Sequence, residues 1–522
     1  MSVAVDPQIF NSFKGIREFN GVNAGGVISA LESVNVELIQ SEIGSATGIK
    51  SMEGNALAYS LPDGYTCIEI FESIQDNFPY IIIYGENDTK GTLFYIGVDK
   101  TVKILLDDLT KTGACNGLTM YSSAYDVFVF TNGEEIRTVA FTTDSNYSNV
   151  VQGHNPVAIA DGGYIATIDA KDFLGRTIKG LAITAWNGFL VMNCSYGIAS
   201  SHQNDVYTWN DDPKDVADSW YIEFSKKVTA LASFTGGLYI FTKDDCTLLN
   251  VTPNDSTNAK LITSSGIGCF SYNSITKHDA YLFFYDGNQK NIYYLGVTDT
   301  TGQTKPTGPV AKEIQSYFSR VERLKMYSCI YDTHNEIWCL VDDKVLIFDY
   351  AQQEWLERTE QELNTILLSQ NSVYSGDKLG NIRLERIGNK FDESYYPSKY
   401  KTTFINIGSS SNMKKQKTPL LLELNTDYTQ DFYVQLICNG KEKNPKRVRV
   451  RDNNVSQYGS AKYNQSKFAP KRPYNKKIVE ISTPQTWYTL GIKVYTEELG
   501  QGFYISSMEL KNIKAKTKTR GR

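Results

Sequence analysis

The sequence predicts an all-β protein built around a six- or seven-bladed β-propeller, with an N-terminal segment before it and a C-terminal β domain after it. The chain has 522 residues, which suggests two or three domains. It contains 34 Tyr and 24 Phe, and aromatic residues favour strands over helices. Apolar segments with tight-turn residues recur along it, whereas amphipathic helical patterns are scarce. These observations together predict the fold class.

The stretch 125–141 is the clearest of the recurring segments. It consists of two apolar runs joined by Asn132-Gly133, a pair that accepts positive φ in a type I′ hairpin turn. A hairpin alone is marginally stable in water and needs a hydrophobic surface to pack against. We therefore expect this hairpin to pack on its sequence neighbours.

Similar hairpins have apolar cores that begin near residues 80, 127, 189, 238, 281, 337 and 373. A spacing of roughly 40 to 60 residues suits four-stranded propeller blades with loop insertions. A β-sandwich is the alternative, but its strands usually recur every 8–12 residues without this longer period. The repeats thus predict blades arranged around one axis, closed on themselves so that free sheet edges are removed.

Changes in the pattern define the expected boundaries. Short helices are predicted for 311–320 and for 27–40. Pro397 and the polar run 408–412 precede a strand-rich part without the blade pattern, and protease should cut at these two places. The expected segments are an N-terminal segment at 1–59, the propeller at 60–396 and a basic C-terminal β domain at 397–522.

Charge changes sign near the second boundary. Residues 398–522 contain 24 Lys+Arg and 9 Asp+Glu, a balance of +15; subtraction from the totals of 53 and 58 leaves 29 and 49, a balance of −20, in residues 1–397. This asymmetry implies an acidic or polyanionic partner for the basic part, or contact between adjacent subunits. The candidate docking residues are Lys414, Lys415, Lys417, Lys446, Arg447, Arg449 and Arg451.

No catalytic, metal or cofactor site is predicted. The eight cysteines are scattered singly, which favours buried hydrophobic roles over zinc ligation. The four histidines have no metal-ligand spacing, and Asp211-Asp212-Pro213 fits a turn better than a calcium loop. No local pattern singles out the pair of carboxylates that a glycosidase needs. We therefore expect a protein that is not an enzyme, with its Trp residues in the core.

The sequence also allows a prediction of the cellular compartment in which the chain folds. No apolar run is long enough to predict membrane insertion, and the N-terminal residues lack the basic and apolar regions of a secretory signal. We expect the chain to fold in a cytoplasm.

The order of motifs resembles one known family. In the middle of the chain these are Tyr207–Pro213, Trp220, Val228–Phe241, Ser265–Ile275, Ala280–Gly287 and Val345–Trp355. Matching segments near the ends are Gly25-Gly26, Glu32–Glu37, Gly48–Gly54, Lys399–Phe404, Lys414–Lys417 and Gly502–Leu510, with a closing Arg-Gly-Arg. Together they resemble the tail hub, or nozzle, proteins of short-tailed bacteriophages, also called phage stabilisation or tail accessory proteins. Ser51-Met-Glu-Gly stands where the family usually has Arg-Pro-Gly.

The resemblance implies a structural virion protein of the phage tail, assembled in the host cytoplasm and active in genome ejection. Family members form a hexameric ring that extends the DNA-exit channel below the portal and its adaptor. Their partners are further copies of the chain, the portal–adaptor proteins, tail fibre, needle or plug proteins, and the genomic DNA that passes through. The alternative is a carbohydrate-binding or glycosidase-type propeller used in receptor recognition.

Overall fold

The computed structural model is nearly all β-structure and divides into two compact units. Unit 1 comprises 1–56, 346–360 and 386–522, and unit 2 comprises 57–345 and 361–385. The units therefore interleave the expected linear segments, because the N-terminal residues belong with the C-terminal part. The structure describes residues 2–5, 8–10, 12–17, 27–40, 47–97, 99–212, 214–254, 261–296, 306–358, 362–387, 396–404, 419–426, 430–450, 475–482, 487–498, 501–511 and 513–516.

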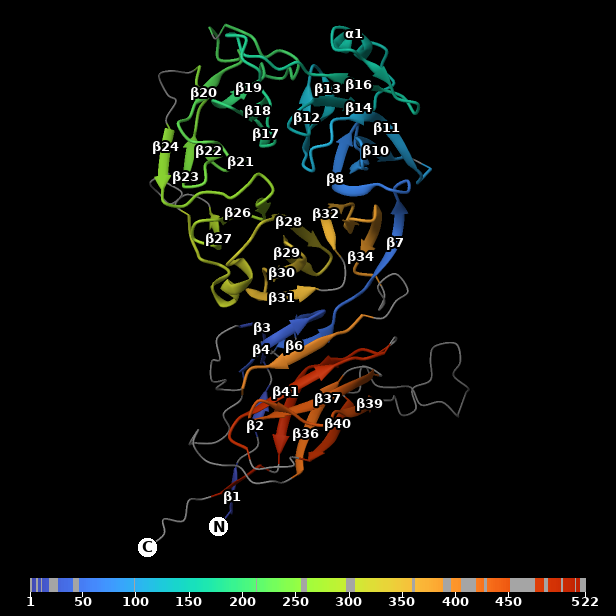
Figure 1. Ribbon diagram of the computed structural model, residues 1–522, viewed down its shortest axis with the longest axis vertical. Helices are drawn as coiled ribbons and strands as arrows, with labels where there is room; N and C mark the ends of the chain where they lie inside the picture. The colour runs from blue at the N-terminus through green and yellow to red at the C-terminus, as the bar shows by residue number, and fades with distance from the viewer. Residues whose placement is uncertain are drawn as a thin grey trace. The chain divides into compact units, whose positions relative to one another are not determined.

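Unit 2 is a succession of antiparallel sheets, each made from consecutive strands (Figure 1). The first is β8 (Thr66–Gln75), β9 (Phe78–Glu86), β10 (Gly91–Ile96) and β11 (Val102–Leu109). The second is β12 (Asn116–Ser122), β13 (Tyr125–Thr131), β14 (Ile136–Ala140), β16 (Tyr164–Thr167) and β15 (Val157–Ala158), with helix α1 (Tyr147–Val151) inserted before β15.

The next sheets repeat this meander. They are β17 (Ile183–Trp186), β18 (Phe189–Cys194), β19 (Gly197–Ser200) and β20 (Tyr221–Glu223); β21 (Ala230–Phe234), β22 (Gly237–Phe241), β23 (Asp245–Leu249) and β24 (Leu261–Ser265); and β25 (Ile275–His278), β26 (Tyr281–Asp286) and β27 (Asn291–Leu295). A 3₁₀ helix, η1 (Lys312–Phe318), follows, which confirms the helix predicted for 311–320.

The last sheets complete unit 2. β28 (Leu324–Tyr331) and β29 (His334–Val341) form a hairpin, β30 (Lys344–Asp349) runs across the boundary between the units, and β31 (Glu354–Arg358) belongs to unit 1. The final sheet has the order β32 (Leu363–Ser369), β33 (Ser372–Asp377), β34 (Asn381–Glu385) and β7 (Asn55–Ser60). β31 pairs with β4 of unit 1, and the blade number of six or seven stays a prediction.

The first strands of the sheets form a closed ring. β8 contacts both β12 and β32, β12 contacts β17, β17 contacts β21, and β28 contacts β25 and β32. Between the sheets of β21 and β25, the rings of Phe241 and Phe284 pack with centroids 4.9 Å apart. β7 closes the ring, because a strand from the beginning of the chain completes the sheet from its end, where Leu61 N–H donates to Gly380 O at 2.9 Å. The predicted propeller is confirmed.

Each repeated apolar core in the sequence corresponds to the same strand position in its sheet. All of the predicted apolar cores, from the one near residue 80 to the one near 373, are second strands of their sheets: β9, β13, β18, β22, β26, β29 and β33. A second strand pairs with another strand on each side, and the two faces of its sheet pack against the neighbouring sheets. Both of its faces are therefore buried. Val127, Phe128, Val129 and Phe130 of β13 are all fully buried, and this explains continuous apolar runs.

The turn at Asn132-Gly133 differs from the predicted type I′ turn. Gly133 has φ +86°, but Asn132 does not have positive φ, and four residues separate Thr131 from Ile136. The Asn132 side-chain carbonyl accepts from the N–H groups of Glu134 and Glu135 at 3.0 and 2.8 Å. The side chain therefore completes the turn, as Asn often does, in place of a second left-handed residue.

Unit 1 contains the strands of both chain ends. Its larger sheet includes β3 (Ser12–Ile16), β4 (Val27–Val34), β5 (Val36–Gln40), β6 (Thr47–Ser51), β35 (Lys399–Thr402), β37 (Gln430–Cys438), β38 (Lys441–Glu442), β39 (Lys446–Val450), β41 (Leu490–Tyr495) and β42 (Tyr504–Ile505). Two smaller sheets have the orders β2 (Gln8–Phe10), β43 (Ser507–Lys511), β36 (Pro419–Thr426), β40 (Asn475–Ser482), and β1 (Ser2–Val5), β44 (Ile513–Lys516).

One prediction for unit 1 is corrected. The helix predicted for 27–40 is wrong: the segment forms β4 and β5, which meet at Asn35 with φ +51°. β4 is paired by β3 and β35 on its two sides, so sheet pairing outweighs a weak helical pattern. At the expected cleavage site, Pro397 O accepts from Asn35 Nδ2 at 2.8 Å and Ser398 N–H donates to Thr496 Oγ1 at 2.9 Å, and cleavage there stays a prediction. Residues 408–412 lie outside the described part.

Candidate functional site

The first strands of unit 2 enclose a cavity of about 370 Å³ at the propeller axis. Its walls come from β8, β12, β28, β32 and the residues at the start of β25. The side chains that face it include Glu69, Glu72, Tyr272 and Tyr327. None of the described lining residues comes from β17 or β21, so the cavity is bounded by the strands on one side of the ring.

Glu69 is the centre of a hydrogen-bonded network beside this cavity. Lys325 Nζ donates to its carboxylate at 2.6 Å and Tyr327 OH donates at 2.9 Å, and the Thr365 hydroxyl is also bonded to it. Lys325 Nζ donates to Ile68 O as well, at 3.0 Å. Glu69 and Lys325 are 6% and 8% exposed, so this is a buried ion pair with its polar atoms satisfied.

The network joins three first strands that are far apart in sequence. Glu69 lies on β8, Lys325 and Tyr327 on β28, and Thr365 on β32. Glu72, the second carboxylate at the cavity, accepts from Ser369 Oγ at 2.7 Å, which again links β8 to β32. The sequence analysis missed these residues, although a charged residue inside the apolar run 66–75 was a usable signal.

Burial and a nearby carboxylate keep two side chains of the cavity wall, Tyr327 and Cys115, protonated. Burial and the nearby Glu69 carboxylate raise the pKa of the Tyr327 phenol well above its usual value, so Tyr327 stays protonated and donates its hydrogen bond. The same two causes raise the pKa of the Cys115 thiol, so Cys115 is a thiol rather than a nucleophilic thiolate. All eight cysteines are buried, as the sequence predicted.

The structure places three of the candidate docking residues together and leaves the others outside its described part. Lys446, Arg447 and Arg449 lie on β39, whereas Lys414, Lys415, Lys417 and Arg451 are not among the described residues. Among the described strands, β39 pairs with β37 alone, through Asp431↔Arg449 and Tyr433↔Arg447. β39 is therefore an edge strand that carries three exposed cations.

The three cations differ in how firmly they are held. Arg447 donates to both carboxylate oxygens of Asp431, at 2.9 and 3.0 Å. Arg449 is 3.7 Å from Asp431 through Nε, and its side chain is 59% exposed. Lys446 Nζ donates to Glu480 O at 2.7 Å. Arg449 is the residue most available to a partner.

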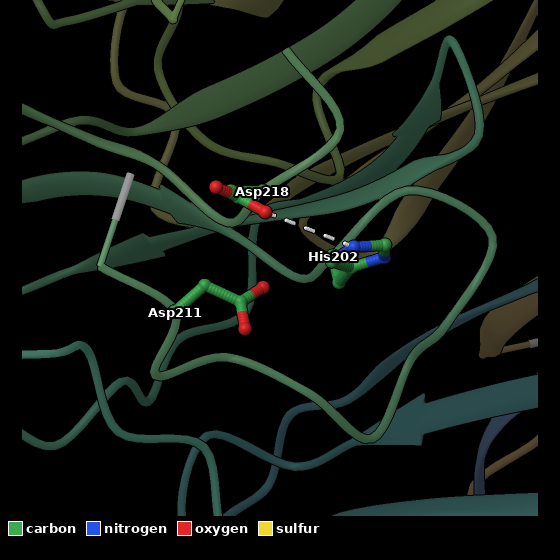
Figure 2. Close-up of side chains that lie close together, drawn as sticks. All are labelled: His202, Asp211 and Asp218. Atoms are coloured by element: carbon green, nitrogen blue, oxygen red, sulfur yellow. Dashed lines mark ion pairs between the residues drawn. The ribbon is translucent and has the colours of Figure 1, made fainter. Parts of the chain in front are cut away.

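The four histidines do not lie together in one cluster. One of them, His202, has acidic neighbours in the structure that the sequence did not predict. His202 lies close to Asp211 and Asp218, and the three ligand atoms are within 4.8 Å of one another (Figure 2). Asp211 was assigned only to a turn by the sequence. The tryptophans behave as predicted, since Trp186, Trp209, Trp220, Trp338 and Trp355 are all buried.

Among the described residues, no helix is long and apolar enough to cross a membrane.

Comparisons with known proteins give similarities in structure alone. No protein-family model matches the sequence, and no curated protein matches it. Solved structures similar to this chain include virginiamycin B lyase from Staphylococcus aureus, with 11% identity and a TM-score of 0.39 over 63% of this chain and 97% of that one. The computationally designed Ika8 protein has 12% identity and a TM-score of 0.38, covering 64% and 100% of the two chains.

BamB from Moraxella catarrhalis is similar to a comparable degree, with 11% identity and a TM-score of 0.36 over 76% of this chain and 99% of that one. At TM-scores below 0.5 these similarities carry no argument about activity. The assignment of the fold rests on the strand order and ring contacts of this chain.

Proposed function

We propose that this chain is a structural protein of a bacteriophage tail, the hub or nozzle ring that extends the DNA-exit channel below the portal and adaptor. The observation that carries the proposal is the exposed cationic edge strand β39 in the basic part of the chain. The sequence resemblance to tail hub proteins supplies the biological setting. Subunits of such a ring need a surface that binds a neighbour, and β39 carries exposed cations and pairs, among the described strands, with β37 alone.

The chemistry of β39 suits docking better than DNA binding. Duplex DNA carries one negative charge per ~1.7 Å, so a basic channel wall would hold the DNA and oppose its passage. Arg447 is already bound to Asp431, which leaves Arg449, on the same face of the strand, as the more available cation. One or two exposed cations match a carboxylate on a protein partner better than they match the continuous charge of DNA. Charges on an edge strand also discourage unwanted strand addition, so they favour a specific neighbour.

The proposal is tested by mixing the purified protein with the portal–adaptor complex and imaging the mixture by electron microscopy. Sixfold rings docked on the complex support a tail hub. A protein that stays monomeric and undocked in the presence of the complex contradicts it. A monomer in isolation is compatible with the proposal, because a ring of this kind can assemble on its template.

A receptor-recognition propeller that binds or cleaves carbohydrate is the second candidate. It is favoured by the axial cavity, where Glu69 and Glu72 provide two carboxylates and Tyr272 and Tyr327 provide aromatic surfaces. A glycosidase needs one carboxyl group as an acid and the other as nucleophile or base. Glu69 already accepts hydrogen bonds from Lys325 Nζ and Tyr327 OH, whereas Glu72 accepts from Ser369 Oγ, so Glu72 is the carboxylate to test first.

The second candidate has its own test. Release of sugar from host surface polysaccharide by the wild-type protein, and its loss in Glu72→Gln, would establish it. Absence of sugar release and of glycan binding in the protein that forms docked rings would eliminate it.

A further inference from the structure

The cluster formed by His202, Asp211 and Asp218 lies in unit 2, between β19 and β20 (Figure 2). Two buried tryptophans anchor the segments that carry it. Trp209 Nε1 donates to Val206 O at 2.7 Å, and Trp220 N–H donates to Ser200 Oγ at 3.1 Å. His202 N–H donates to Thr208 O at 2.7 Å. The three side chains therefore come from backbone that is fixed by its own hydrogen bonds.

The imidazole of His202 is oriented in the way that a metal-binding histidine is. Its Nδ1 is 3.0 Å from Gln203 O, a carbonyl that can only accept, so the proton is on Nδ1. Nε2 is the other ring nitrogen, the one placed to act as a metal ligand, and it faces Asp218 Oδ1 at 4.0 Å, which is too long for a hydrogen bond. A ring nitrogen that donates to a backbone carbonyl while the other is left as a ligand is the usual arrangement around bound metals.

Each aspartate is held through one oxygen and offers another. The N–H groups of Lys214 and Asp215 donate to Oδ2 of Asp218, both at 2.8 Å, which leaves Oδ1 directed toward His202. Ser219 N–H donates to Oδ2 of Asp211 at 3.2 Å. Asn254 Nδ2 bonds the backbone carbonyl of Asp218 at 2.9 Å and fixes its position.

The charge of the cluster calls for a cation. Two carboxylates lie beside the imidazole, and among the described residues no Lys or Arg forms an ion pair with either of them. The nearby Lys214 is paired instead with Asp212, at 2.9 Å. We propose that His202 Nε2, Asp211 and Asp218 Oδ1 bind one divalent transition-metal ion of the Zn²⁺ class, with water completing the coordination.

The choice of metal follows from the ligands. One imidazole nitrogen with two carboxylate oxygens suits Zn²⁺, whereas Ca²⁺ takes oxygen ligands only. Tetrahedral bonds of about 2.0 to 2.1 Å place ligand atoms roughly 3.3 Å apart. The present separations, up to 4.8 Å, need side-chain closure of at most about 1.5 Å. The bound ion would cross-link the two ends of the connection between β19 and β20, and this proposal departs from the expectation that no histidine is a metal ligand.

The test is calorimetric titration of the full chain, stripped of metal with EDTA, with ZnCl₂ at pH 7.5 and separately with CaCl₂. One Zn²⁺ should bind per chain, and His202→Gln and Asp218→Asn should each weaken binding at least about tenfold, the loss seen even for indirect changes at metal sites. Asp212→Asn and His154→Gln are matched controls that should bind like the wild type. Co²⁺ should give a visible d–d spectrum that the His202→Gln variant lacks.

Other outcomes would overturn the site. These are absence of Zn²⁺ binding, Zn²⁺ binding that His202→Gln leaves unchanged, or Ca²⁺ binding tighter than Zn²⁺. Circular dichroism in EDTA keeps the test valid, because a variant counts only if its spectrum and melting temperature match the metal-free wild type. A variant that fails this check is replaced by Asp211→Asn, for which the same tenfold loss is expected.

Discussion

Charged side chains are used in opposite ways in the inner ring of the propeller and on the edge strand of unit 1. Glu69 and Lys325 are buried and bonded to each other at 2.6 Å, with Tyr327 as a further donor to the carboxylate. Arg449 on β39 is mostly exposed, and its Nε lies 3.7 Å from Asp431 Oδ2, which is a loose ion pair. The first pair is satisfied within the ring, whereas the second has capacity left for a partner.

The difference separates residues that hold the fold from residues that are free to make contacts. A buried pair is strongly destabilising when one member is removed, because the other charge has lost its water as well as its partner. An exposed cation loses little on removal, since water replaces the partner. Substitutions in the two regions should therefore affect different measurements.

The largest effect is expected at Lys325. Lys325→Met leaves the buried Glu69 carboxylate without a counterion and should lower the free energy of unfolding of the propeller by about 3–5 kcal/mol. Urea unfolding followed by fluorescence measures it. Lys171→Met, which removes an exposed cation in the same unit, is the control and should change the free energy by less than about 0.5 kcal/mol.

A double variant sharpens the interpretation. Glu69→Gln combined with Lys325→Met should recover part of the loss, because a neutral amide needs no counterion and still accepts from Tyr327. If Lys325→Met unfolds at the wild-type urea concentration, the ion pair does not hold the ring.

An intermediate effect is expected at Asp172, a buried residue of the propeller that lies outside the inner ring. Burial opposes its ionisation, but hydrogen bonds from Arg176 and from Tyr196 OH lower the pKa of Asp172 below its usual value. Its contribution is therefore present above the unfolded pKa of about 3.9 and is lost as pH falls through the lower folded pKa. Asp172→Asn should cost about 1–3 kcal/mol at pH 7.

Thermal unfolding from pH 7 to pH 3 checks the sign. The difference between wild type and Asp172→Asn should shrink below about pH 4, as the wild-type carboxylate becomes protonated. Asp169→Asn, at a side chain that is 75% exposed, is the control and should show little difference at any pH. A difference that stays constant down to pH 3 would contradict the assignment.

The smallest effect on the isolated protein, and one directed at function, is expected at Arg449. Arg449→Glu should leave stability nearly unchanged but weaken binding to the portal–adaptor complex, roughly twofold to fivefold for each exposed pair that is lost. Added salt should weaken the wild-type contact too, because such pairs are screened over about 10 Å at 0.1 M. Sedimentation with the complex measures both. Lys171→Glu is the control, and slower genome ejection with normal assembly would instead place β39 against DNA.

Local patterns in the sequence were enough to predict the propeller. The apolar runs and turn residues that define a second strand are adjacent in the chain, so β9, β13 and the corresponding later strands could be found without the structure. The buried Trp residues and cysteines followed from the same patterns.

Long-range pairing explains what the sequence could not reveal. β7 completes a sheet whose other strands begin more than 300 residues later, and no local pattern marks such a partner. Glu69 meets Lys325 across 256 residues. The helix prediction for residues 27–40 was wrong for the same reason, because this segment forms strands through pairing with β3 and β35. His202 and Asp218 became neighbours only through the fold of one blade.

The proposal that this chain forms the hub ring of a phage tail can be tested by cryo-electron microscopy of the intact virion tail at a resolution that separates strands. We expect six copies of the chain below the adaptor, each showing the propeller, with β39 and Arg449 against an acidic surface of a neighbouring protein. A tail in which the chain is absent, or in which it lies at the fibre tips with the axial cavity turned toward the host surface, would contradict it.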